Sequence, residues 1–144
     1  MTTTLPAQLA EIRDEFLELE GKDRLELLLE FANDLPALPE RLLDDPALTE
    51  RVEECQAPVY IALEISDGAV QMYATAPREA PTTRGFASIL VQGLSGLAPD
   101  EVLAVPSDYP QMLGLNELVS PLRVRGMTGM LARAKRQIQA RLAA

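Results

Sequence analysis

Cys55 is the only residue in the sequence that offers a sulfur nucleophile. The chain of 144 residues has a single cysteine and no histidine. Cys-His and Ser-His-Asp mechanisms within this chain are therefore excluded, because both use an imidazole as the general base. Zinc and iron–sulfur sites of the usual kinds are excluded too, since they need several cysteine or histidine ligands. The sequence also has no Gly-rich phosphate loop. Chemistry must therefore run on Cys55, on carboxylates, or on a partner.

The carboxylates make a weaker case for catalysis. The pairs Asp44-Asp45 and Glu53-Glu54 are adjacent in sequence, and such residues are usually solvated surface rather than a catalytic dyad. With no histidine to serve as a base, a self-sufficient hydrolase is disfavoured. We expect no self-contained active site, no metal and no bound cofactor.

The segment around Cys55 favours an accessible position over a core position. A lone cysteine is more often an inert, buried small residue. Here it lies in Val52-Glu53-Glu54-Cys55-Gln56-Ala57-Pro58, just before a predicted strand. Polar neighbours and the nearby proline indicate a loop at the entrance of that strand. Glu54 places a negative charge beside the sulfur, and this disfavours the thiolate.

The charge is distributed unevenly. The net charge is −9, with −10 on residues 1–54 and +1 on residues 55–144. An acidic chain of this kind argues against nucleic acid as the main partner. We interpret the acidic half as a solvated helical surface, with steering of a partner as the alternative.

Composition also bears on location. No apolar run approaches the length needed to span a membrane. The start, Met1 to Thr4 followed by Leu5-Pro6, has neither a basic region nor an apolar stretch, so we expect no signal peptide. A lone cysteine cannot form an internal disulfide, which fits a reducing compartment. We therefore expect a cytoplasmic protein.

Apolar residues at spacings of three and four predict two amphipathic helices in the first 35 residues. The first ends at Gly21 and carries Leu5, Leu9, Ile12, Phe16 and Leu19. Asp23 and Glu26 resemble a capping box that opens the second. Its predicted inner face consists of Leu25, Leu28, Leu29, Ala32 and Leu35. The prolines of the segment 35–39 predict an extended connector. A short helix should follow, with Asp45 and Pro46 at the cap and first position of the next turn.

The middle of the chain predicts a β-hairpin over about 59–75. Apolar residues alternate from Val59 to Ser66, and Asp67-Gly68 is a strong signal for a hairpin turn. Pairing across that turn sets three apolar pairs on one face: Ile65 with Val70, Leu63 with Met72, and Ile61 with Ala74. That face must be covered by helices.

Helices are predicted again after the hairpin. One follows Pro77 and Pro81 and buries Phe86, Ile89, Leu90 and Leu94, and a shorter one starts at Pro99. The last opens at Ser120-Pro121. Its predicted inner stripe is Met127, Met130, Leu131, Ala134, Ile138 and Leu142. Its basic residues are predicted to be mainly solvated or partner-facing: Arg123, Arg125, Arg133, Lys135, Arg136 and Arg141. The whole indicates one α+β domain over residues 1–144, with a small antiparallel sheet packed against several helices.

Several segments of the chain together match the pattern of one known protein family. Leu35-Pro36-Ala37-Leu38-Pro39-Glu40 resembles the family's connector, and Cys55-Gln56 with the strand after it resembles its Gly-Cys-Gln-Ser signature. Arg84-Gly85 resembles the start of its middle helix. The approach to its last helix is matched by Leu113-Gly114-Leu115, Ser120-Pro121-Leu122-Arg123 and Gly126-Met127. The pieces occur in the family's order from about the first helix to the C-terminus. The chain thus resembles the SufE family, the sulfur acceptors of iron–sulfur cluster assembly. Two residues depart from the signature, Glu54 in place of glycine and Ala57 in place of serine.

The resemblance implies a SufE/NifU-like fold and a role as sulfur acceptor. Cys55 would accept sulfane sulfur as a persulfide from a SufS-type cysteine desulfurase, which depends on pyridoxal phosphate (PLP), and would pass it to a SufB-type scaffold. Gln56, Arg84 and Arg123 would support the sulfur or bind the partner. The family also implies a cysteine on a loop tip, with its side chain turned into an apolar recess until the desulfurase docks.

A binding adaptor is the alternative from another class. An acidic α+β module could dock on a partner enzyme and regulate it without accepting sulfur, because a fold does not fix a function. Alkylation of the thiol separates the two hypotheses, since an adaptor should survive the loss of a free thiol.

Overall fold

Three antiparallel strands form a sheet in the order β1-β2-β3. The computed structural model describes residues 5–143, with β1 at Glu50–Arg51, β2 at Tyr60–Ser66 and β3 at Ala69–Thr75. The predicted hairpin is confirmed, and so is its register, in which Leu63 pairs with Met72 and the two other apolar pairs lie as expected. Asp67 and Gly68 both have positive φ, 53° and 77°, as a tight type I′ turn requires. The sequence did not predict β1, because two residues are too short to show a pattern.

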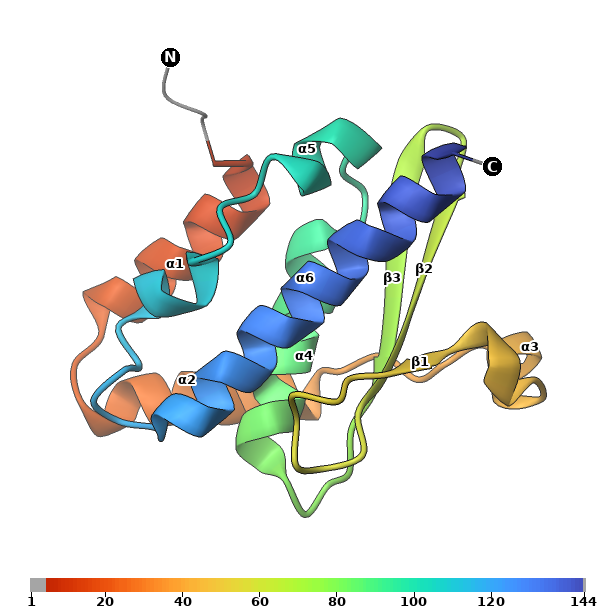
Figure 1. Ribbon diagram of the computed structural model, residues 1–144. Coiled ribbons are helices and arrows are strands. Elements are labelled where there is room, and N and C mark those ends of the chain that lie inside the picture. Colours follow the sequence, from red (N-terminus) through yellow and green to blue (C-terminus); the bar gives the residue numbers. More distant parts are fainter. Residues whose placement is uncertain (1–4, 144) are drawn as a thin grey trace.

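Helices cover the inner face of the sheet (Figure 1). In chain order they are α1 (Ala7–Glu18), α2 (Lys22–Asn33), α3 (Glu40–Leu43), α4 (Pro81–Leu94), α5 (Pro99–Leu103) and α6 (Pro121–Ala143), with 3-10 turns η1 (Pro46–Leu48) and η2 (Tyr109–Leu113). Helix α4 packs on β3 and α6 on β2, and the two helices also contact each other. Helices α1 and α2 pack on α4. The fold is a single α+β domain, as predicted.

The core lies between the hairpin and these helices. The hairpin residues that point inward, such as Ile61 and Met72, are fully buried. Phe16 of α1 and Phe31 of α2 stack with their ring centroids 5.9 Å apart. Each large apolar side chain buried in this way contributes about 1.5–3 kcal/mol. On the outer face, Arg41 of α3 pairs with Glu64 and lies over the ring of Tyr73. Short helix α3 is therefore held against the back of the sheet.

Two predictions about the N-terminal helices were wrong. The capping box does not form: α2 starts after Gly21, which has a φ of 48°, and no side chain caps it. Leu29 is 44% exposed, and Phe31 is buried in the same helix. The face of α2 that turns inward is set by its packing against α4, which the periodicity of α2 alone does not contain. The prediction for Asp45 is confirmed, since its side chain accepts a hydrogen bond from the backbone N–H of Ala47.

Helix α6 differs from its prediction at one residue of the inner stripe. Leu142 is 55% exposed, because the last turn of the helix extends beyond the core and all of residues 139–143 lie in solvent. The basic residues of α6 are mainly exposed, as predicted, and the two exceptions have partners within the chain. Lys135 donates to the backbone carbonyl of Val105, and Arg133 forms ion pairs within the chain.

Residues 1–4 lie outside the described residues, and so does the part of the signal-peptide prediction that rests on them. Within the described part of the chain, no helix is both long and apolar enough to cross a lipid bilayer.

Candidate functional site

Cys55 lies on a loop, residues 52–59, that joins β1 to β2. The base of the loop is closed by a hydrogen bond from the N–H of Val52 to the carbonyl of Val59, at 2.9 Å. Both of these valines are fully buried and anchor the loop in the core. Between them, the N–H of Cys55 donates to the carbonyl of Val52 at 3.1 Å. In the described chain no other backbone–backbone hydrogen bond involves residues 53–58, so this segment can move at a low cost in backbone hydrogen bonds.

The side chain of Cys55 points into the core. It is 7% exposed and belongs to the main hydrophobic cluster. Its sulfur rests on α6 at Gly126, where an added Cβ would lie only 3.0 Å from Sγ. The predicted loop is therefore correct for the backbone, but the expectation that Cys55 avoids a core position is wrong for the side chain. The burial agrees with the recess that the family resemblance implied.

Burial controls the acidity of this thiol. It raises the pKa of Cys55 to about 11, with a further increase from the Glu54 carboxylate and an opposing effect of the Arg133 guanidinium. At pH 7 a thiol with that pKa is ionised in about one molecule in ten thousand. The thiolate is the reactive form, so the buried sulfur is protected in this arrangement. It becomes a good nucleophile only when the loop or a partner changes its surroundings.

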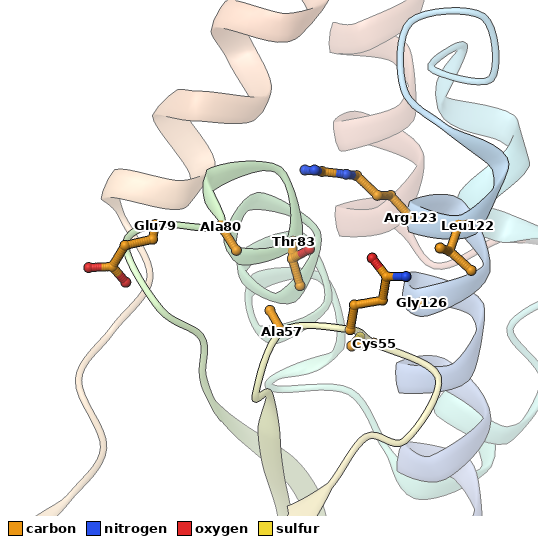
Figure 2. A pocket seen from close by; sticks show the side chains of 9 residues that line it. Cys55, Ala57, Glu79, Ala80, Thr83, Leu122, Arg123 and Gly126 are labelled. Atoms are coloured by element: carbon orange, nitrogen blue, oxygen red, sulfur yellow. The ribbon is translucent and has the colours of Figure 1, made fainter.

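A cavity of about 250 Å³ opens beside Cys55 (Figure 2). Three parts of the chain line it: the loop with Cys55, Gln56 and Ala57; the start of α4 with Glu79, Ala80 and Thr83; and the start of α6 with Leu122, Arg123 and Gly126. The volume is slightly below the range typical of small-molecule sites. It is large enough to receive a side chain or a short peptide segment from a partner.

The structure brings together three of the four predicted site residues. Gln56 and Arg123 line the same cavity as Cys55. Arg123 is exposed, and its side chain extends into the space between the starts of α6 and α4 (Figure 2). Arg84 does not line the cavity. Its guanidinium donates to the backbone carbonyls of Ala32 at 2.9 Å and Ala76 at 2.6 Å, so it joins α4 to α2 and to the end of β3.

The comparison with known proteins decides the family. The SufE model, described as an Fe-S metabolism associated domain, matches residues 10–138. The chain belongs to the SufE family. It is 52% identical over 137 residues to an uncharacterized SufE-like protein of Mycobacterium tuberculosis, an alignment that covers 94% of each chain.

Two further likenesses extend the comparison. The solution structure of a hypothetical protein from Thermus thermophilus shares 35% identity, with a TM-score of 0.85 over 98% of this chain and 100% of that one. A protein of Plasmodium vivax named cysteine desulfuration protein SufE is 27% identical over 94 residues, covering 62% of this chain and 39% of that protein.

Some residues of this SufE site were missed from the sequence. Thr83 lies in the first turn of α4, and Ala80 directly precedes the helix. The N–H groups of such a first turn have no intrahelical partner and carry a partial positive charge. Gly126 had a usable signal: a glycine inside a helix costs about 1 kcal/mol relative to alanine, so it often marks a close approach. Arg133, the ion-pair partner of Glu54, had no such signal in the sequence, because the two residues are 79 positions apart.

Among residues 5–143, no group of three or more His, Cys, Asp or Glu side chains is placed to hold a metal ion.

Proposed function

We propose that this SufE-family protein accepts sulfane sulfur on Cys55 from a SufS-type, PLP-dependent cysteine desulfurase. The observation that carries the proposal is the position of Cys55, the chain's only thiol, on a weakly bonded loop beside an open cavity. The name of the Plasmodium vivax relative, a cysteine desulfuration protein, supports the same role.

The proposed transfer is a thiol–disulfide type of exchange. The Cys55 thiolate attacks the outer sulfur of the persulfide on the desulfurase cysteine. A new S–S bond forms to Cys55 while the bond between that outer sulfur and the desulfurase cysteine breaks. The electron pair leaves with the desulfurase thiolate, which takes up the proton that Cys55 gave up. The exchange has no net oxidation or reduction and needs no cofactor on this chain.

The cavity suits the charge that this exchange creates. A thiolate or a persulfide anion presented at its mouth lies near the Arg123 guanidinium and the positive end of α4. We propose that Arg123 stabilises this anion and that Gln56 binds the partner. Arg84 supports the site from a distance, because it fixes the position of α4.

The proposal also includes the recipient of the sulfur and the compartment in which the protein works. We propose a SufB-type scaffold as the recipient and the cytoplasm as the compartment, since a persulfide on a single cysteine is best preserved where stray oxidation is low.

A measurement of desulfurase turnover distinguishes a sulfur acceptor from an adaptor. We expect the protein to stimulate cysteine desulfuration, and we expect prior alkylation of Cys55 to remove the stimulation. An alkylated protein that still binds the desulfurase and stimulates it fully would reject sulfur acceptance in favour of an adaptor.

Arg123→Ala should slow sulfur transfer by about tenfold in single-turnover assays, because one charge-assisted interaction with the anion is lost. The dissociation constant for the desulfurase should stay within about twofold of the original, as expected for one exposed rim charge. Arg125→Ala is the matched control, since Arg125 is exposed on the same helix but does not line this cavity. Equal transfer rates in the two variants would refute the role of Arg123.

A further inference from the structure

We infer that Glu54 and Arg133 are positioning residues for Cys55, and that their ion pair is a latch whose opening presents the sulfur. The inference deepens the proposed function and rests on Cys55 as the acceptor. It starts from Glu54, the charged residue directly before the cysteine.

The guanidinium of Arg133 contacts the segment that precedes Cys55 at three points. The Nε atom of Arg133 lies 2.7 Å from a carboxylate oxygen of Glu54. Its Nη1 atom lies 2.8 Å from a carboxylate oxygen of Glu50 and donates to the carbonyl of Arg51 at 3.3 Å. The Arg133 side chain is only 18% exposed and that of Glu54 35%, so the pair is shielded from water more than a surface ion pair.

Two of these three points are fixed, and the third can move. Glu50 and Arg51 form β1, and Glu50 is held further by Arg136 and by Gln137, whose amide donates to it at 2.9 Å. Gln137 is itself bound to β2, because its side-chain oxygen accepts from the N–H of Leu63 at 2.9 Å. Arg133 is therefore anchored to the sheet whether or not Glu54 is in place.

Glu54 is the movable point. Among residues 53–58 as the structure describes them, it is the only one whose side chain makes a hydrogen bond. The loop tip is thus tied to α6 by this ion pair and by the burial of the Cys55 side chain. Breaking the ion pair leaves the burial of the Cys55 side chain as the remaining tie between the loop tip and α6.

The surface of α6 fits the closed loop at two neighbouring turns. A Cβ on Gly126 would lie 3.0 Å from the Cys55 sulfur, and one on Gly129 would lie 2.6 Å from the carboxyl carbon of Glu54. Both side chains therefore rest directly on the helix backbone. The Cys55 sulfur and the Glu54 carboxylate therefore pack on the same helix, α6.

The charged groups around Cys55 come from three elements. Glu54 belongs to its own loop, Arg133 and Arg123 to α6, and Glu79 to the segment before α4. Glu54 raises the pKa of Cys55 and Arg133 lowers it. A purely electrostatic role would therefore make the two residues act in opposite directions on the thiol, whereas a latch makes them act in the same direction. This difference allows a sharp test.

The test is the alkylation rate of Cys55 in the full chain with iodoacetamide, a neutral reagent, measured from pH 7 to 11. At pH 8 we expect Glu54→Gln and Arg133→Gln each to react about three to ten times faster, the effect of losing an ion pair worth about 1 kcal/mol in the closed state. The apparent pKa of the reaction should fall most in Glu54→Gln, where exposure and the loss of a neighbouring negative charge act together, and less in Arg133→Gln, where the loss of the guanidinium opposes the effect of exposure.

Controls distinguish the latch from general loosening. Arg41→Gln breaks the ion pair with Glu64 at the back of the sheet and should leave the rate unchanged. Arg133→Lys keeps the positive charge and should restore most of the protection. A slower reaction of Arg133→Gln, or an unchanged rate of Glu54→Gln, would overturn the latch. If Arg133→Gln does not fold, Glu54→Asp takes its place, because it keeps the negative charge and shortens the reach to Arg133: the latch predicts faster alkylation, and an unchanged rate would overturn it.

The alkylation experiment contains no desulfurase, so its result does not depend on the proposed function. Faster alkylation of Glu54→Gln together with a failure of persulfide loading in the original chain would reject sulfur acceptance and leave the latch in place. Normal loading with unchanged alkylation rates would reject the latch alone.

Discussion

Replacing Cys55 with serine should abolish both persulfide loading and stimulation of the desulfurase. The chain has no other thiol, and a serine hydroxyl at neutral pH is not an adequate nucleophile toward a sulfur atom. Intact-mass analysis after incubation with desulfurase and free cysteine should show one added sulfur atom on the original chain and none on Cys55→Ser. Turnover of the desulfurase should fall to the rate measured without this protein.

Folding must be checked in that experiment, because the serine hydroxyl replaces the sulfur of a buried residue, Cys55, which is 7% exposed. A buried hydroxyl without a partner costs about 1–3 kcal/mol. Cys55→Ala avoids this cost and should show the same loss of loading. Loading of either variant would show that the sulfur is not carried on Cys55. Full stimulation by a variant that takes up no sulfur would point instead to an adaptor.

Replacing Gly126 with valine should displace the Cys55 loop from its seat on α6. Already the Cβ would lie 3.0 Å from the Cys55 sulfur, and the two methyl groups of valine extend beyond it. The displaced thiol should return from a pKa of about 11 toward 9.0, its unperturbed value. At pH 8 this raises the thiolate fraction by about 100-fold, which is the upper limit of the expected increase in alkylation rate.

Overpacking at Gly126 should also lower the free energy of unfolding by about 1–3 kcal/mol. Ala132→Val is the control, because it adds the same branched side chain at an exposed position of the same helix. Alkylation rates and denaturant midpoints of the two variants should be compared in parallel. A folded Gly126→Val protein that reacts as slowly as the original would mean that the sulfur is not held by contact with α6.

The hairpin could be predicted from the sequence because its determinants are local. Alternating apolar residues and the Asp67-Gly68 turn fix both the strands and the register, and the three predicted pairs occur in the structure. Proline positions placed the starts of α4, α5 and α6 for the same reason. The cysteine loop followed from its polar neighbours and from the family signature.

The rest depends on contacts between distant parts of the chain. Which side of α2 turns inward is decided by α4, so Leu29 was misplaced and the buried position of Phe31 was missed. The cysteine loop contacts Gly126 and Arg133, which lie more than 70 residues away from Cys55 along the chain. No local pattern encodes such a contact. The glycines inside α6 were the one available signal, since a helix without a close neighbour has no reason to carry them.

The most direct test of sulfur acceptance is a single transfer from a preloaded desulfurase. The desulfurase is first charged with one persulfide, freed of cysteine, and mixed with an equal amount of this protein before alkylation and peptide mapping. We predict that the extra sulfur leaves the desulfurase and is found on the peptide that contains Cys55, from which a thiol reductant removes it. A persulfide that stays on the desulfurase, although the two proteins are shown to bind, would contradict the proposed function.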